Sequence, residues 1–573
     1  MRTLERIYRR RVPLSQITTR ELTQSLLDGS RETGRQVGAL VHRSGSVDFV
    51  IVGDAGKLEL PDIGRLRAAQ GRFRGLRLIH THLRNEPLTR DDLVDLVRLR
   101  LDLVCAILLR GDGDAGQIHY AHNVPSSGPL ATADGRAYRE IGPVRADRLD
   151  VDFGALVADL ESEFQRLART REVVAKDGRA ILIHVAEKSK ARDADVATSL
   201  RELQELARTA GVEVVDVVIQ QRDKIDPKFV LGRGKLDDVV IRAMQLDAQT
   251  LIFDRELSPT QAAAIASVMD LKVIDRTQLI LDIFAQRAES KDGKLQVELA
   301  QLKYALPRLG LKDDALSRLT GGIGGRGPGE TKLEIGRRRA RERVHHLEQH
   351  VKALARQRQQ RRRSRGRGDV PVVAIVGYTN AGKSTLMNAL TGSTVFAEDK
   401  LFATLDTRAR RLFLPTTDPA PEARAGREIV LVDTVGFIRD LPEDLFAAFR
   451  ATFEEAADAD LLLHLVDASD PAHAAHIATT EALLEELGLH ERPRLLIYNK
   501  SDLLVGGEGE RKVVGRRKAF LTSAIDARGH AAIVTAIDVS LREIDEERRL
   551  SSADEIFAID GVTIANGRAS YGA

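Results

Sequence analysis

One stretch constrains the fold of this chain more than any other: a phosphate-binding loop set between a predicted strand and a predicted helix. Residues 377–384, Gly-Tyr-Thr-Asn-Ala-Gly-Lys-Ser, match G-x-x-x-x-G-K-[ST]. The apolar run 372–376 before them predicts a buried strand, and residues 385–390 predict a helix. In this setting backbone N–H groups surround phosphates, Lys383 reaches the β- and γ-phosphates, and Ser384 places a hydroxyl on Mg²⁺. The stretch therefore predicts an α/β nucleotide-binding domain.

Two segments further along the chain fit the switch elements of such a domain. Thr404, in the segment 401–406, is placed to add a second hydroxyl to Mg²⁺ when a γ-phosphate is present. The predicted strand 428–432 ends in Asp433, which would hold Mg²⁺ through water, and the amide of Gly436 would sense the γ-phosphate. Both segments predict a site that distinguishes the triphosphate from the diphosphate.

A predicted strand at 461–466 leads to Asp467, and the end of the strand predicted after it, 494–498, indicates which base is bound. Asn499-Lys500-Ser501-Asp502 follows it, and the Asp502 carboxylate can accept from N1–H and the exocyclic amine of guanine, which adenine does not offer in that arrangement. Backbone amides near Ser523 would support the base. The sequence thus predicts a GTP-hydrolysing domain over residues 369–545. Its expected GTP contacts are Gly377, Tyr378, Thr379, Asn380, Ala381, Gly382, Lys383, Ser384, Phe402, Ala403, Thr404, Leu405, Asp406, Asp433, Thr434, Val435, Gly436, Asn499, Lys500, Ser501, Asp502, Ser523 and Ala524.

Phe437 stands where many GTPases carry a glutamine that orients the attacking water. A phenyl ring cannot do this, so no residue is assigned as catalytic base. We expect slow intrinsic hydrolysis that depends on a partner, a reordered switch or a cation. Because Asn380 offers an extra oxygen ligand, K⁺ is a candidate cofactor beside Mg²⁺.

Composition limits the class of protein. At 573 residues the chain is too long for a single core. One cysteine, Cys105, excludes a disulfide framework and a Cys-rich zinc site, and fits a reducing compartment. No apolar run is long enough to span a membrane, and no signal peptide is evident at the start. We expect a cytoplasmic monomer, with peripheral attachment to a membrane left open.

Basic residues gather in one region. Between Arg337 and Arg367 there are thirteen Lys or Arg and two acids. Such an excess, nearly all arginine, favours a polyanionic partner such as RNA; the alternative is a solvated helix face that continues into a basic linker. The expected RNA contacts are Arg326, Lys332, Arg337, Arg338 and Arg339.

The same region predicts a helical hairpin over residues 281–360. One helix is expected over 277–306, and a second over 330–359, where Val344, Leu347, Val351 and Leu354 form a short coiled-coil seam. Six glycines among residues 320–330 lie between the helices and let the backbone approach a partner closely. We interpret this stretch as the tip of a probe for a narrow, negatively charged cavity; the alternative is a plain flexible connector.

Upstream, residues 179–280 predict a small parallel α/β subdomain. Strands are expected at 180–185, 212–219, 250–254 and 272–275, with helices between them. Gly232-Arg233-Gly234-Lys235 lacks the full phosphate-loop spacing, so we interpret it as a turn that opens a helix, with a second nucleotide or RNA contact as the alternative.

The first 155 residues alternate apolar runs with a helical stretch and predict an N-terminal α/β extension. His80 and His82 end a predicted strand, so their side chains point to the same side. Asp92 follows and completes a set of ligands that zinc accepts.

This pattern resembles the metal motif of the JAB/MPN metalloprotease fold, H-x-H followed by Ser-x-x-Asp. Here Thr89 replaces the serine, and the separation from His82 is one residue shorter. The resemblance implies that Glu32 stands where that fold keeps its catalytic glutamate. A metal-dependent hydrolase, a bound metal alone and a degenerate structural remnant all stay open.

From about 179 to 545 the chain resembles the HflX family of ribosome-associated GTPases. The resemblance implies binding to the large ribosomal subunit and its rRNA, with the hairpin tip near the peptidyl-transferase centre, and in some members the splitting of stalled or idle ribosomes. The departures are Thr407-Arg408-Ala409 in place of Pro-Thr-Thr and Glu443 in place of a histidine. Matching segments are 377–384, 402–406, 433–437 with Ile438, Asp440 and Leu441 after it, 499–502, the Gly232/Gly234/Lys235/Leu236 segment and 321–330.

The expected protein is therefore an α/β multidomain chain. A P-loop GTPase domain follows the small parallel subdomain with its hairpin, the N-terminal extension precedes them, and residues 546–573 form a C-terminal tail. An RNA-binding or signalling GTP switch that does not act on ribosomes is the main competing interpretation, and a hydrolase in the extension is the remote one.

Overall fold

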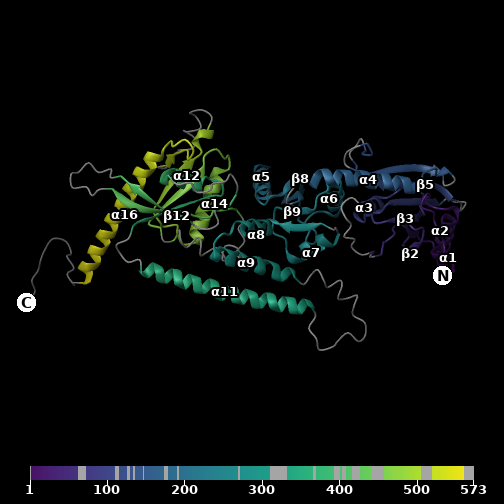
Figure 1. Cartoon of the computed structure of the whole chain (residues 1–573), viewed down its shortest axis with the longest axis horizontal. Helices are drawn as coiled ribbons and strands as arrows, with labels where there is room; N and C mark the ends of the chain where they lie inside the picture. The colour runs from purple at the N-terminus through teal and green to yellow at the C-terminus, as the bar shows by residue number, and fades with distance from the viewer. Residues whose placement is uncertain are drawn as a thin grey trace, which may run out of the picture. The chain divides into compact units, whose positions relative to one another are not determined.

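The computed structural model of the chain is drawn in Figure 1. The chain divides into two compact units, Met1–Arg276 and Thr277–Ala573. None of the helices in the described part of the chain combines the length and the apolar character that crossing a membrane requires. The structure describes residues 2–61, 63, 73–109, 115–125, 129–132, 136–145, 148–172, 178–189, 193–268, 271–309, 332–364, 370–392, 401–402, 408–415, 426–439, 457, 459–504 and 519–559.

The first unit opens with a six-stranded sheet in the order β2-β1-β3-β4-β5-β6. Strands β3 and β4 are parallel and the other neighbouring pairs are antiparallel. Every residue of β3 is buried, because β3 lies inside the sheet with both faces covered. The expected boundary at residue 155 falls inside α4. The elements are α1 (Arg2–Tyr8), α2 (Arg20–Thr33), β1 (Val37–His42), β2 (Val47–Val52), β3 (Leu76–His82), α3 (Arg90–Arg98), β4 (Leu103–Leu109), β5 (Ala115–Asn123), β6 (Tyr138–Arg145) and α4 (Phe153–Glu172).

A second sheet in this unit has four parallel strands in the order β10-β9-β7-β8, which confirms the predicted small parallel subdomain. Its strands β7, β9 and helix α6 share a core that includes Ile181, Phe253 and Leu236. The turn at Gly232 opens α6, as predicted. The elements are β7 (Arg179–Glu187), α5 (Asp193–Thr209), β8 (Glu213–Arg222), α6 (Arg233–Gln245), β9 (Thr250–Phe253), α7 (Pro259–Val268) and β10 (Lys272–Asp275).

Helices open the second unit. The prediction of one helix over 277–306 is wrong: α8 (Arg276–Arg287) ends before α9 (Lys291–Ala305) begins. The Ser290 side chain accepts from the Gly293 N–H and caps α9, which starts a new helix there. A short 3-10 turn, η2 (Leu306–Arg308), follows α9 and contains Pro307.

Helix α11 (Lys332–Ser364) packs against α9. Arg343 pairs with Glu298 at 2.8 Å and Lys303 with Glu348 at 2.7 Å. Leu347, from the predicted seam, is fully buried, and Val344, Val351 and Leu354 are half-buried, whereas most of the helix between them is exposed. The glycine-rich stretch 321–330 and Arg326 lie outside the described residues.

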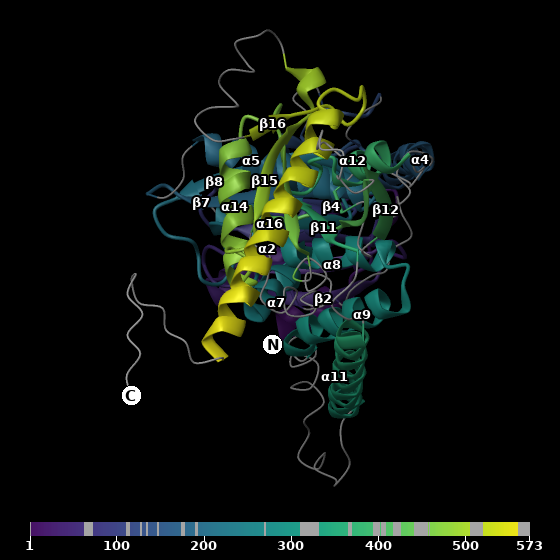
Figure 2. The same cartoon turned by 90° about the vertical axis from the view of Figure 1, so that its left-hand side faces the viewer.

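The predicted GTPase domain contains a six-stranded sheet in the order β12-β13-β11-β14-β15-β16, in which only β12 is antiparallel to its neighbour. Helices α12 and α16 share a core with β11 and β14, and α14 packs against residues on the alternate positions of β14 and β15. The long α16 is the yellow helix of Figure 2. The elements are β11 (Val372–Gly377), α12 (Lys383–Thr391), β12 (Arg408–Leu414), β13 (Arg427–Asp433), β14 (Leu461–Asp467), α14 (His473–Glu486), β15 (Arg494–Asn499), η3 (Ser501–Leu503), β16 (Ala519–Leu521) and α16 (His530–Ile559).

Candidate nucleotide-binding site

The phosphate loop joins the end of β11 to the start of α12, and two glycines are required for its path. Gly377 has φ 150°, and a Cβ there would lie 2.2 Å from the carbonyl oxygen of Leu465. Gly382 has φ 89°, and a Cβ there would lie 2.3 Å from Nδ2 of Asn499. Any larger side chain at either position would collide with a neighbouring strand or with Asn499, so the predicted glycines are fixed by close approach as well as by conformation.

Lys383 begins α12 and its side chain is buried. Nζ donates to the carbonyl oxygens of Tyr378 at 2.9 Å and Gly377 at 3.3 Å. Burial lowers the pKa of Lys383 to about 8, with the charge of Asp433 opposing this effect. An ammonium held at the loop with little water around it is suited to pairing with phosphate oxygens.

Ser384 and Asp433, the two predicted Mg²⁺ ligands that the structure describes, are brought together. Ser384 Oγ donates to Asp433 Oδ2 at 2.5 Å, and Asp433 is fully buried at the end of β13. A hydroxyl and a carboxylate are the hard oxygen donors that Mg²⁺ prefers, so this pair fits the ion. The third predicted ligand, Thr404, lies outside the described residues, as do Ala403, Leu405, Asp406, Asp440, Leu441 and Glu443.

The segment after β13 lies against the phosphate loop. Phe437 donates from its N–H to the Gly377 carbonyl at 3.0 Å and accepts at its own carbonyl from the Thr379 N–H at 2.8 Å. Its ring is 1% exposed. A Cβ on Gly436 would lie 2.8 Å from Cα of Thr379 and 2.9 Å from Nζ of Lys383. The tight approach leaves no room for a side chain at position 436.

Between these residues, Thr434 and Val435 complete the segment. Thr434 Oγ1 donates to the carbonyl of Ile375 at 2.7 Å, and both Thr434 and Val435 are buried. These contacts tie the predicted γ-phosphate sensor to β11, the strand that delivers the phosphate loop.

The predicted base-recognition residues meet at the other end of the site. Asn499 donates from Nδ2 to the Ala381 carbonyl at 2.8 Å and accepts at Oδ1 from the Ala524 N–H at 3.0 Å. Ser523 Oγ donates to Asp502 Oδ1 at 2.6 Å. Asn499 is buried, whereas Asp502 is exposed. Asn499 thus links the phosphate loop to the segment that contains Ala524, and Asp502 is accessible, as the predicted contact with guanine requires.

Two side chains to which the sequence analysis gave no role, Asp467 and His476, contact predicted residues of this site. Lys500, in the left-handed region at φ 62°, pairs with Asp467 Oδ2 at 2.7 Å. Tyr378 stacks on His476 with ring centroids 3.9 Å apart. The place of Asp467 at the end of a predicted strand was a usable signal, because the ends of parallel strands meet at one edge of a sheet. No pattern in the sequence pointed to His476.

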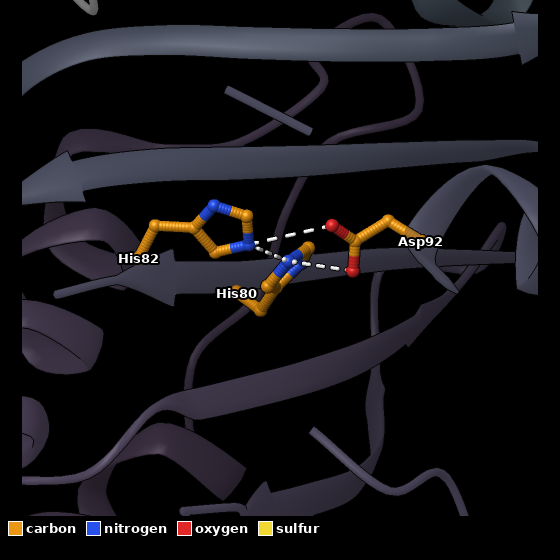
Figure 3. Close-up of side chains that lie close together, drawn as sticks. All are labelled: His80, His82 and Asp92. Atoms are coloured by element: carbon orange, nitrogen blue, oxygen red, sulfur yellow. Dashed lines mark hydrogen bonds and ion pairs between the residues drawn. The ribbon is translucent and has the colours of Figure 1, made fainter. Parts of the chain in front are cut away.

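The other predicted residues lie elsewhere. Arg337, Arg338 and Arg339 are on α11, where Arg338 and Arg339 are exposed; Lys332 begins this helix. His80, His82 and Asp92 come together in the first unit, as Figure 3 shows. Glu32 is exposed near the end of α2 and is not part of that group.

Three family models match consecutive parts of the chain. They are described as GTP-binding GTPase N-terminal, residues 197–285, GTP-binding GTPase Middle Region, residues 287–365, and 50S ribosome-binding GTPase, residues 372–500. GTPase HflX of Caldanaerobacter subterraneus is 45% identical over 388 residues, which cover 68% of this chain and 84% of that protein. The chain belongs to the HflX family of GTPases. GTPase HflX of Escherichia coli is also 45% identical, over 57% of this chain and 73% of that one.

Membership of the HflX family confirms the resemblance seen in the sequence and makes the chain a GTP-binding protein that hydrolyses GTP. A solved GTP-binding protein of Sulfolobus solfataricus in complex with GDP is 23% identical, with a TM-score of 0.35, and the match covers 64% of this chain and 99% of that one. The three HflX-related models begin at residue 197, so the six-stranded N-terminal sheet lies outside the residues that they match.

Proposed function

We propose that this GTPase binds the large ribosomal subunit in its GTP state, leaves on hydrolysis, and rescues or splits stalled or idle ribosomes in the cytoplasm. The observation that carries the proposal is the exposed arginine surface of α11, in the same compact unit as the nucleotide site. The family model that matches the GTPase domain is described as ribosome-binding.

The surface of α11 has the character of an RNA contact. Arg338, Arg339, Arg341 and Arg343 are exposed, and the side chain of Arg338 is 57% exposed. Among the described residues, Glu298 pairs with Arg343, and Glu342 lies 3.8 Å from Arg338. Arginine binds phosphates through a planar fork and stacks on bases, so this surface favours ribosomal RNA over a weakly charged partner.

The chain's own residues account for GTP binding. Lys383 supplies a buried positive charge to the phosphates, Gly436 lets its amide approach the loop, and Asp502 accepts from guanine. Ser384, and Asp433 through water, would hold Mg²⁺, which would neutralise phosphate charge. Asn380, at φ 60° in the phosphate loop, is our candidate ligand for K⁺.

The position of Phe437 supports control by a partner. Its buried ring cannot orient a water molecule. Both its N–H and its carbonyl oxygen form hydrogen bonds with the phosphate loop. Water activation must then come from a group outside this segment or from a rearrangement of the segment. Such a dependence is expected of a GTPase whose hydrolysis is tied to ribosome engagement.

Turnover with and without large ribosomal subunits tests the proposal. We expect steady-state GTP hydrolysis to rise at least about tenfold, equivalent to about 1.4 kcal/mol of barrier, when large subunits are added. Small subunits serve as the control for RNA in general. Equal turnover with large, small and no subunits would contradict the proposal and favour a switch that acts away from ribosomes.

A further inference from the structure

We propose that the N-terminal domain binds one zinc ion through Nε2 of His80, Nε2 of His82 and the carboxylate of Asp92, and that this ion secures the first turn of α3 to the central sheet. The proposal concerns the part of the chain that precedes the HflX-related region, and it is independent of the proposed ribosome binding.

The three ligand groups are close together (Figure 3). The Nε2 atoms of His80 and His82 lie 2.8 Å apart, Nε2 of His80 lies 3.2 Å from Asp92 Oδ1, and Nε2 of His82 lies 3.4 Å from Asp92 Oδ2. Tetrahedral zinc with bonds near 2.0–2.1 Å separates its ligand atoms by about 3.3 Å. The observed spacing therefore fits an ion with little movement of the side chains.

The hydrogen bonding of His82 leaves the correct nitrogen available. Nδ1 of His82 lies 2.9 Å from the carbonyl oxygen of Glu86, which only accepts, so Nδ1 carries the proton. In the neutral ring the lone pair is then on Nε2, which faces His80 and Asp92. A carbonyl partner on the far nitrogen is the arrangement that orients metal-binding histidines.

The scaffold fixes the other ligands. His80 and His82 alternate along the buried strand β3 and so share one face of the sheet. Asp92 Oδ2 accepts from both the N–H and the hydroxyl of Thr89 at 2.7 Å, which locks the carboxylate at the N-terminus of α3. Gly38 lies opposite His80, and a Cβ there would lie 3.1 Å from the His80 Cβ and 2.7 Å from Leu58 Cδ2. The absence of a side chain at Gly38 leaves room for the ring.

The ligand set points to zinc and to a binding role. Two imidazoles and one carboxylate suit zinc, whereas Mg²⁺ and Ca²⁺ prefer oxygen ligands throughout. Among the described residues no second carboxylate joins the group, and Glu32 is exposed near the end of α2. A hydrolytic site needs a base beside the metal, and the residues that the structure describes here offer none for peptide cleavage.

The ion would act through α3, whose first turn has contacts on several sides. Arg90, between Thr89 and Asp92, donates to the carbonyl of Gly234 at 2.9 Å and pairs with Asp238 on α6. Asp91 pairs with Lys57 at 3.3 Å. Fixing Asp92 therefore also holds Arg90 against α6, the helix that the turn at Gly232 opens.

The test measures zinc bound to the untagged full chain after incubation with ZnCl₂ and removal of the excess. We expect about one zinc per chain, a higher midpoint of thermal unfolding with zinc than after chelation, and, with cobalt in place of zinc, visible absorption bands of a tetrahedral site. In Asp92→Asn and His82→Gln the bound zinc should fall at least tenfold. His42→Ala, an exposed histidine on the neighbouring strand β1, should keep it.

A wild-type chain that binds GDP, and is therefore folded in its second unit, but retains less than a tenth of an equivalent of zinc would overturn the proposal. Equal zinc content in wild type and Asp92→Asn would overturn it too, because the ion would then be held elsewhere. If His82→Gln fails to fold, the wild-type metal content and Asp92→Asn still decide the question.

Discussion

The ring of Phe284 meets the ring of Phe402 edge to face, with centroids 4.6 Å apart and planes at 80°. Phe402 lies immediately before the segment 403–407 that carries the predicted Mg²⁺ ligand Thr404, and its backbone is in the left-handed region at φ 54°. On the other side of that segment, Arg408 pairs with Glu289 at 3.4 Å. Both flanks of the predicted switch are therefore anchored to α8 and the turn before α9, the helix that packs on α11.

This anchoring predicts a measurable coupling between the two rings. Phe284→Ala and Phe402→Ala should each lower the free energy of unfolding of the second unit by about 3 kcal/mol, because both rings are buried. The double variant should cost less than the sum by about 1 kcal/mol, the value of a well-placed aromatic pair. Calorimetry on the GDP-bound chain measures the effect. Phe284→Ala combined with Phe520→Ala on β16 is the control pair and should be additive; additive losses for Phe284 and Phe402 would contradict the coupling.

Asp502→Asn should weaken GTP binding at least about a hundredfold, because one charged acceptor that serves two guanine donors is replaced by a neutral amide. Xanthosine triphosphate, which presents a carbonyl where guanine has an amine, should bind the variant better than it binds wild type. Competition with a fluorescent nucleotide measures both affinities. Asp223→Asn, an exposed carboxylate in the first unit, provides the matched control. Unchanged GTP affinity in Asp502→Asn would remove Asp502 from base recognition.

Lys383 predicts a pH dependence of nucleotide binding. In the structure its pKa is lowered to about 8, first by burial, whereas its ordinary value is 10.5. Phosphates keep the bound ammonium charged, so between pH 8 and the bound-state pKa binding must take up a proton. The titration of Lys383 should leave nucleotide affinity unchanged below pH 8. Above pH 8 it should lower the affinity by up to about tenfold per pH unit. Calorimetric titration at pH 9 in two buffers of different ionisation enthalpy counts the protons; no uptake would contradict the assignment.

Potassium should raise turnover relative to sodium at equal ionic strength if Asn380 contributes an oxygen to a K⁺ ion beside the phosphates. We expect a gain of at least about tenfold, and its loss in Asn380→Ala. GDP affinity measured for the same variant shows whether the loop still binds nucleotide. Identical rates in sodium and potassium would exclude the ion as a cofactor.

Much of the fold could be predicted because periodicity and loop chemistry are local. The strand before Gly377 and the four-stranded parallel sheet were predicted from apolar runs and confirmed. Strand β12 was not, because Arg-Ala-Arg-Arg interrupts its apolar pattern, as is common in edge strands. The break between α8 and α9 was missed because Ser290 caps a helix inside a stretch whose apolar spacing continues past it.

The site was predictable where a motif fixes both residue type and spacing. Gly382, Lys383 and Asn499 gather at one end of the parallel sheet, because the loops after β11 and β15 emerge at the same edge. The contact of Phe284 with Phe402 could not be predicted. The two residues are more than a hundred positions apart, and no sequence motif or periodic pattern includes both of them. The predicted tail 546–573 begins within α16, which continues to Ile559 because nothing in the sequence ends the helix at 546.

Co-sedimentation with large ribosomal subunits tests the central claim most directly. We expect the full chain to pellet with large subunits in the presence of a non-hydrolysable GTP analogue, to pellet far less with GDP, and to lose binding when residues 321–329 are deleted. The Arg337→Glu, Arg338→Glu, Arg339→Glu variant should bind more weakly, with a shallower dependence on salt. Pelleting that ignores the nucleotide, or that survives the deletion unchanged, would contradict the account.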